Sequence, residues 1–207
     1  MPAWNRALFL LVNAPPGAPA ADIHIARWLA ASPLLVAPLL LVALWVWGNR
    51  RARGGLLATT AATLLGLGMN QVLGALYPEP RPFMIGLGRT LLHHAQDNSF
   101  PSDHATLVWT VAVGLIATRA APGWGTAMGL YGAGVAWARV FLGVHFPLDM
   151  IGSAGVAIVG AGLAQLALRW PVPWLLGPVE AIYERSLSLL RLPRSLVPRA
   201  SPPADTP

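Results

Sequence analysis

Five long stretches with at most one charged residue each dominate the sequence and limit the folds open to it. They lie at residues 32–48, 54–77, 104–118, 124–138 and 148–168. A helix needs about twenty apolar residues to cross the hydrocarbon core of a bilayer. Hydrophobic residues make up 55% of the chain and charged residues 11%, which is outside the balance of soluble domains. We therefore predict an all-α fold, a polytopic transmembrane bundle of about five spans formed by one domain over residues 1–207.

Segments near both ends of the chain have amphipathic rather than uniformly apolar patterns. Charged and apolar residues alternate over 22–29 and again over 180–191, which is typical of helices that lie in the membrane interface. Residues 170–174 read Trp-Pro-Val-Pro-Trp and predict an interfacial break after the fifth span. The Pro-rich tail over 195–207 is expected to be disordered.

The distribution of arginine predicts the orientation of the bundle. The chain carries a net charge of +6, and its basic residues are scattered between apolar runs rather than gathered with aromatics, which argues against a nucleic-acid partner. Arg50, Arg51 and Arg53 crowd the loop between the first two spans, and Arg119 follows the third. The positive-inside rule makes these loops cytoplasmic. We predict a multi-pass protein of the bacterial cytoplasmic membrane.

The same topology gathers the polar chemistry of the chain on the outer, periplasmic side. Three blocks meet there, at residues 80–82, 101–104 and 139–149, and all five histidines lie on that side. The chain has no cysteine, which excludes disulfides and thiolate metal sites. The sequence thus predicts one polar site at the outer end of an apolar bundle.

The third block predicts an activated imidazole. Arg139 is expected to end one helix and Asp149 to begin the next, so that His145 lies in the turn between them. A carboxylate on one imidazole nitrogen fixes the tautomer and raises the basicity of the other nitrogen. We therefore expect His145 to be a nucleophile oriented by Asp149.

The other two blocks predict a site for phosphate. Ser102 is a good N-cap for the helix that follows, and the exposed N–H groups of a helix start attract anions. His104 in that first turn can protonate a leaving oxygen, while Arg81 and Arg139 can hold phosphate oxygens. Such a set meets the main demands of phosphoryl transfer without a metal.

These blocks resemble the type 2 phosphatidic acid phosphatase superfamily, the lipid phosphate phosphatases. The motifs of that family run Lys-x6-Arg-Pro, Pro-Ser-Gly-His and Ser-Arg-x5-His-x3-Asp, and the match covers about Gly74 to Asp149 within a motif-bearing core at 70–168. The resemblance implies an acid phosphatase/vanadium haloperoxidase-like core and needs no metal or other cofactor. It also implies a phosphohistidine on His145, with His104 as the proton donor to the leaving group.

The resemblance implies phosphate ligands as well, and the chain departs from the motifs at three positions. The ligands carried over are Arg81, Ser102 and Arg139, and we place Asp103 with them because it lies in the second block. The departures are Gly74 for the Lys, Asp103 for the Gly and Ala138 for the Ser.

Candidates for the missing positive charge lie in the loop before the second block. His93, His94 and Arg89 could each supply it, although the pattern favours His93 and His94 as a solvated pair outside the catalytic set. His24 is expected to be interfacial. Asn70 and Gln71 are expected to form hydrogen bonds between helices.

Two loop segments on the predicted outer side resemble one branch of this superfamily in particular. Residues 77–83 and 93–104 look like the bacterial undecaprenyl-diphosphate phosphatase branch, which implies a polyprenyl diphosphate as the substrate, a role in lipid-carrier recycling or bacitracin resistance, and a motif without the Lys. Phosphatidylglycerol phosphate, phosphatidate and diacylglycerol diphosphate remain alternative substrates. A second alternative is a non-catalytic lipid-binding or transport protein. The sequence predicts no oligomeric state.

Overall fold

Helices account for nearly all of the regular structure in the part of the chain that is described, residues 2–168 and 171–189 of a computed structural model. They are α1 (Ala3–Val12), α2 (Ala20–Ala31), α3 (Pro33–Trp47), α4 (Arg50–Leu76), α5 (Asp103–Ala117), α6 (Pro122–Phe141), α7 (Pro147–Leu168) and α8 (Pro171–Leu189), with a short 3-10 helix, η1 (Pro82–Ile85). The prediction of an all-α bundle is confirmed. The expected tail at 195–207 lies outside the described residues.

Each of the five predicted spans corresponds to one helix, α3 to α7, with bounds that differ by a few residues. By length and hydropathy, α4 and α7 can each cross a membrane, and α2 with α3 forms a third candidate bent by 54°. The bend falls beside Pro33, which is well tolerated at a helix start but has no N–H with which to continue the preceding helix. The count of five spans remains a prediction.

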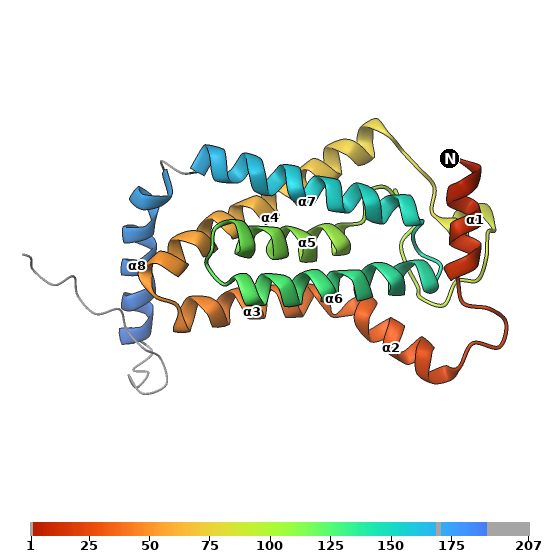
Figure 1. Cartoon of the computed structure of the whole chain (residues 1–207), viewed down its shortest axis with the longest axis horizontal. Coiled ribbons are helices and arrows are strands. Elements are labelled where there is room, and N and C mark those ends of the chain that lie inside the picture. The colour runs from red at the N-terminus through yellow and green to blue at the C-terminus, as the bar shows by residue number, and fades with distance from the viewer. Residues whose placement is uncertain (1, 169–170, 190–207) are drawn as a thin grey trace, which may run out of the picture.

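The arginines assigned to a loop between the first two spans instead lie in the first turn of α4. That helix begins at Arg50 because the side chain of Asn49 caps it, accepting the backbone N–H of Ala52 at 2.9 Å. The loop prediction was wrong in detail because the N-cap precedes the charged run. The arginines still lie at the end of α4 that is opposite the loop between α4 and α5 (Figure 1).

Helix α5 forms the centre of the bundle and packs against α4, α6 and α7 (Figure 1). Its residues Val108, Val111 and Leu115 recur at helical spacing and are buried in one cluster with Leu56 of α4 and Val135 of α6. Figure 1 also shows that α5 begins deeper in the bundle than the neighbouring ends of α4, α6 and α7. The start of α5 is therefore recessed, which leaves room for a polar site above it.

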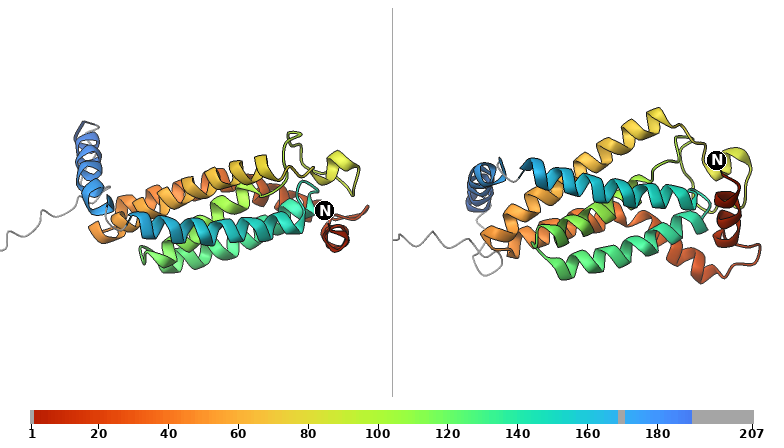
Figure 2. Two further views of the ribbon diagram at one scale, coloured as in Figure 1. Left: turned by 90° about the horizontal axis from the view of Figure 1, so that it is seen from above. Right: turned by 45° about the horizontal axis from the view of Figure 1, so that its top comes forward.

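Two helices lie across the opposite ends of the bundle, α1 at the end with the outer loops and α8 at the other (Figures 1 and 2). A helix is found over the predicted segment 22–29, as α2, while its interfacial location remains a prediction; α1 was not predicted. A break does follow the fifth span, since α7 ends at Leu168, but its expected extent over 170–174 was wrong, since α8 begins at Pro171. Proline in a first turn removes only an N–H that has no helical partner, so the helix can start there.

A buried cationic cluster holds α8 on the bundle. The guanidinium of Arg53 lies over the rings of Trp45 and Tyr183, with 5.5 and 5.1 Å to the ring centroids. Glu180 of α8 forms ion pairs with Arg50 at 2.8 Å and with Arg53 at 3.5 Å. These structural ion pairs lie at the end of the bundle opposite the loop between α4 and α5.

Candidate active site

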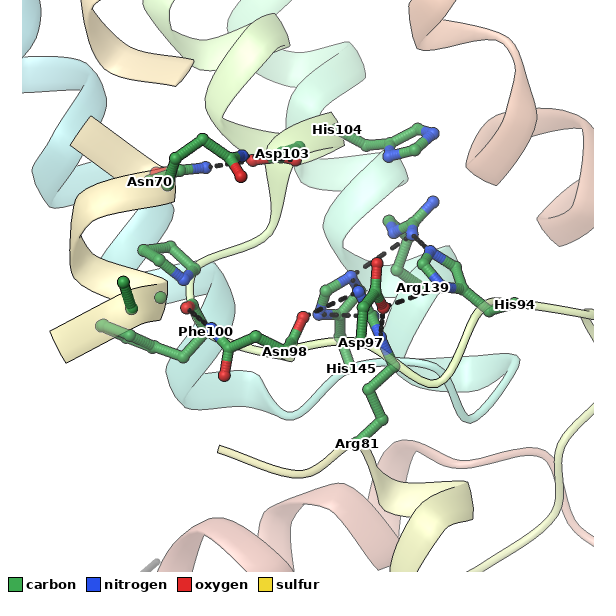
Figure 3. Close-up of a pocket in the computed structure, with 14 residues that line it drawn as sticks. Asn70, Arg81, His94, Asp97, Asn98, Phe100, Asp103, His104, Arg139 and His145 are labelled. Carbon is green, nitrogen blue, oxygen red and sulfur yellow. Dashed lines mark hydrogen bonds and ion pairs between the residues drawn. The ribbon is translucent and has the colours of Figure 1, made fainter. Parts of the chain in front are cut away.

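A polar cavity of about 340 Å³ lies above the recessed start of α5 (Figure 3). Residues from all three predicted blocks line it, namely Arg81, Pro101, Asp103, His104, Arg139 and His145. The loop between η1 and α5 adds His94, Asp97, Asn98 and Phe100, and the end of α4 adds Asn70, Gln71, Gly74 and Ala75. The blocks therefore converge as the sequence predicted, but the loop before α5 and the end of α4 complete the cavity wall.

His145 lies in the tight turn between α6 and α7 and is almost fully buried. Gly143 makes this turn possible, because its φ of 80° lies in the left-handed region and a Cβ there would overlap the carbonyl oxygen of Arg89. Nδ1 of His145 lies 3.1 Å from Oδ2 of Asp149, i,i+4 along the chain. Asp149 therefore contacts the imidazole as predicted.

The surroundings of His145 Nε2 determine which nitrogen carries the proton. Nε2 lies 2.9 Å from Nη1 of Arg81 and 3.3 Å from Nη2 of Arg139. A guanidinium can only donate hydrogen bonds, so Nε2 must accept them and has no proton. The proton is on Nδ1 and is donated to Asp149. Burial, and next the charge of Arg139, lower the pKa of His145 well below its usual 6.5, so the ring stays neutral.

Asp149 is held by more than its histidine. It lies in the first turn of α7, where Oδ2 accepts the backbone N–H of Phe146 at 2.8 Å and the hydroxyl of Ser99. The first of these contacts is half of a capping box, in which a carboxylate reaches back to the residue before the helix. Asn5 of α1 supplies a further cap, since its Oδ1 accepts the N–H of Leu148 at 2.9 Å. The carboxylate is therefore fixed from three sides.

The two arginines of the site are anchored by backbone carbonyls. Arg81 donates to the carbonyl of Val144 at 2.9 Å and to that of Asn98 at 2.9 Å, and its Nε pairs with Asp97 at 2.7 Å. Arg139 donates to the carbonyl of Ala30 at 3.1 Å. Both side chains are buried, so their charges are only weakly screened by water. Each presents one guanidinium edge to His145, which suits binding of an anion there.

The second block is placed differently from the prediction in two respects. Ser102 is the residue before α5, but its side chain forms no capping bond and does not line the cavity. Its backbone N–H instead donates to the hydroxyl of Ser153 at 2.9 Å. Asp103 lines the cavity and accepts from Asn70 at 2.8 Å and from Gln71 at 3.4 Å. The predicted interhelical bonds of these two amides are thus confirmed, while phosphate binding by Ser102 and Asp103 stays a prediction.

Of the three candidates for the missing charge, the structure brings His94 into the site. Its Nε2 lies 3.0 Å from Nη2 of Arg139, whereas His93 is exposed and Arg89 donates to the carbonyl of Pro15. The interpretation of His93 and His94 as a solvated pair was therefore wrong for His94. Burial, and next the charge of Arg81, lower the pKa of His94 below 6.5.

The structure also explains why Gly74 stands where the family motif has a lysine. Gly74 lies on the cavity wall in the last turn of α4, and a Cβ there would lie 2.8 Å from Nδ2 of Asn98. Asn98 is held in that place because its Oδ1 accepts the N–H of Glu79. The loop that brings His94 to the cavity thus also fills the space that a longer side chain at Gly74 would need.

Comparison with known proteins settles the family. Residues 54–173 match the PAP2 superfamily. The chain belongs to the PAP2 superfamily. The resemblance seen in the three blocks is therefore confirmed, and this PAP2 protein is a lipid phosphatase.

Relatives and a solved structure agree with this assignment. The PAP2 protein is 37% identical over 163 residues to the Escherichia coli K12 protein named "Putative undecaprenyl-diphosphatase YbjG", covering 78% of this chain and 81% of that one. It is 35% identical over 121 residues to the undecaprenyl-diphosphatase BcrC of Bacillus subtilis, covering 58% and 62%. The crystal structure of Aquifex aeolicus LpxE shares the fold with a TM-score of 0.60 at 24% identity, covering 78% of this chain and 94% of that one.

Proposed function

We propose that this lipid phosphatase hydrolyses undecaprenyl diphosphate to undecaprenyl phosphate and inorganic phosphate, and so returns the lipid carrier to cell-wall synthesis. The names of the two relatives support this substrate. The observation that carries the chemistry is the unprotonated Nε2 of His145, which two buried guanidinium groups face. An anion held by those groups would place its phosphorus next to this nitrogen.

The first step of the proposed reaction forms a phosphohistidine. Nε2 of His145 attacks the distal phosphorus, and the bond from that phosphorus to the bridging oxygen breaks. His104, which lines the same cavity, takes up a proton from solvent when the anionic substrate binds and donates it to the departing lipid phosphate. Arg81 and Arg139 hold the equatorial oxygens, and Asp149 stabilises the positive charge that develops on the imidazole.

The second step releases phosphate and restores the enzyme. A water molecule attacks the phosphorus of the phosphohistidine, and the bond between phosphorus and Nε2 breaks. The water gives one proton to His104, which returns it to solvent as phosphate leaves. Nδ1 keeps its proton throughout, because Asp149 remains hydrogen-bonded to it.

An apolar cavity next to the site supports a lipid substrate. It has a volume of about 420 Å³ and is lined by Leu34, Leu67 and Leu107 together with Asp103 and His104, which also line the polar cavity. A phosphate ester with a long hydrocarbon tail matches this pairing of a polar and an apolar space. The motifs contact phosphate and not the tail, so phosphatidylglycerol phosphate, phosphatidate and diacylglycerol diphosphate are the alternatives.

A competition assay distinguishes these lipids. Purified protein in detergent with EDTA is given each lipid at the same mole fraction, and phosphate release is measured. We expect kcat/KM for undecaprenyl diphosphate to exceed the others by about tenfold or more, a difference of about 1.4 kcal/mol in activation free energy. The variants His145→Ala and His104→Ala report background hydrolysis. Failure to cleave any of the four lipids would favour the non-catalytic alternative.

We also propose that the site faces the outside of the bacterial cytoplasmic membrane. The support is the placement of Arg50, Arg51, Arg53 and Arg119 away from the outer loops. Because the chain has no cysteine, single variants Arg51→Cys and His93→Cys each carry one thiol. In intact spheroplasts a membrane-impermeant maleimide should label only His93→Cys. Labelling of Arg51→Cys alone would reverse the orientation.

A further inference from the structure

The hydrogens on Nη2 of Arg139 are shared between two imidazoles. Nη2 lies 3.0 Å from Nε2 of His94 and 3.3 Å from Nε2 of His145, and the two rings meet edge to face with centroids 6.2 Å apart (Figure 3). A guanidinium nitrogen of this kind has two hydrogens, and both are directed at imidazole lone pairs. In this arrangement His94 is therefore, like His145, a neutral ring whose Nε2 has no proton.

The other nitrogen of His94 faces acceptors. Nδ1 lies 3.3 Å from the carbonyl oxygen of Ala95 and 3.5 Å from Oδ1 of Asp97. Neither oxygen can donate, so Nδ1 keeps its proton whatever happens on the cavity side of the ring. Asp97 also pairs with Nε of Arg81, which fixes the carboxylate between the two groups.

An anion in the cavity changes this arrangement. A phosphoryl group bound by Arg81 and Arg139 takes the N–H groups of both arginines, so His94 loses its one guanidinium donor and His145 loses both of its donors. For His145 the released lone pair can attack phosphorus. For His94 the released lone pair would face anionic oxygens, which is an unfavourable contact between two acceptors unless the nitrogen gains a proton.

We propose that His94 is a phosphate-binding residue that takes up one proton at Nε2 when the anion enters, and then donates that hydrogen to a non-bridging oxygen of the distal phosphoryl group. The proton comes from solvent, since the side chain of Asp97 beside the ring is 57% exposed. The resulting imidazolium lies between Asp97 and the bound anion. No bond to phosphorus is made or broken in this step, and the proton returns to solvent when phosphate leaves.

Burial and the charged neighbours of His94 decide whether the ring takes a second proton. Burial, Arg81 and Arg139 disfavour it, and Asp97 favours it. A dianion placed among these groups offsets the repulsion from the two arginines, so protonation follows binding rather than preceding it. His94 thereby supplies a positive charge from the loop, at a cavity where α4 has Gly74 in the place of the family lysine.

Inorganic sulfate tests this without substrate, because it carries two charges throughout the neutral range and brings no proton of its own. Sulfate binding to the full-length protein is measured by titration calorimetry at neutral pH, in two buffers with different ionisation enthalpies. The wild type should take up about one proton more per sulfate than His94→Gln, and its affinity should fall as the pH rises. His94→Gln keeps a polar side chain without a second charge, and should bind sulfate roughly ten- to hundred-fold more weakly.

His93→Gln is the matched control, since it removes the adjacent, exposed histidine and should leave affinity and proton uptake unchanged. Asp97→Asn keeps the His94 ring and should reduce the proton uptake. If His94→Gln is unstable, imidazole nitrogen NMR of the wild type, which has five histidines, should still report His94 becoming protonated with sulfate. A neutral His94 with sulfate bound, or a proton uptake in His94→Gln equal to that of the wild type, would overturn the proposal.

This inference rests on the proposed function for its substrate, but the two fail separately. Sulfate binding does not depend on which lipid is cleaved, so a different lipid preference would leave the His94 result intact. Proton uptake that is absent would leave lipid cleavage by His145 untouched.

Discussion

Asn5 in α1 caps α7, the helix that carries Asp149, by accepting the backbone N–H of Leu148 at 2.9 Å. Phe146, the residue before α7, has no side-chain atom that could accept this N–H. Asn5, which lies 143 positions before Leu148, supplies the acceptor. Helix α1 is thus part of the support for the proposed catalytic dyad.

Asn5→Ala should therefore destabilise the protein and lower kcat. The loss of a helix cap costs about 1 kcal/mol, with a range of about 0.5–2 kcal/mol. We expect a lower melting temperature in detergent and a decrease in kcat with little change in KM, because the change acts through Asp149. Arg6→Ala alters the exposed neighbour on α1 and should change neither quantity. Equal effects of both variants would contradict the capping role.

Ser99 and Ser102 should differ sharply when each is replaced by Ala. Ser99 donates its hydroxyl to Asp149, so its loss leaves a buried carboxylate with one donor fewer, at a cost of about 1–3 kcal/mol. Ser102 lies outside the cavity lining, and its hydroxyl has no hydrogen-bond partner among the described residues. Steady-state kinetics should show a large loss for Ser99→Ala and a small one for Ser102→Ala. A large increase of KM in Ser102→Ala would instead support its predicted contact with phosphate.

Introducing the family lysine should harm this protein. Gly74→Lys places a Cβ 2.8 Å from Nδ2 of Asn98, and overpacking of this kind costs about 1–3 kcal/mol. We expect a lower melting temperature and lower activity, with the melting temperature partly recovered in the double variant Gly74→Lys/Asn98→Ala. If Gly74→Lys alone raised activity at an unchanged melting temperature, Asn98 would not be what excludes the lysine.

Acid should destabilise the protein through His145. Burial lowers the pKa of this ring in the folded state, whereas an unfolded histidine titrates near 6.5. As the pH falls below about 6.5 the unfolded chain binds the proton first, so the stability that is complete above this pH is lost progressively. In anion-free buffer the melting temperature should fall with acid, less steeply for His145→Asn. A slope that is the same in His145→Asn as in the wild type would contradict this account.

The sequence predicted those parts of the fold and site that depend on local pattern. Uncharged runs located α3 to α7, and the spacing of Arg139, His145 and Asp149 placed a dyad in one turn. Contacts between distant segments could not be predicted in this way. Asn5 and Ser99 contact the start of α7 from 143 and 50 positions away, and nothing in their own neighbourhoods marks them as supports of Asp149.

His94 shows the same limit in a different form. Its neighbour His93 has the same side chain, so composition alone could not decide which ring faces the cavity. The path of the loop decides it, because that path directs His94 toward Arg139 and leaves His93 exposed. Similarly, the helix-start signal located Ser102 correctly before α5. It could not show that the backbone N–H of Ser102 donates to the hydroxyl of Ser153.

Transfer of the distal phosphoryl group to His145 is the central claim, and a single-turnover experiment tests it most directly. Undecaprenyl diphosphate labelled with radioactive phosphorus at the distal position is mixed with excess enzyme, quenched in alkali within one turnover, and the labelled peptide is mapped. The wild type should carry label on His145, and His145→Ala should carry none and release phosphate about 10³-fold or more slowly. Release at the wild-type rate by His145→Ala, or label on another residue, would contradict the account.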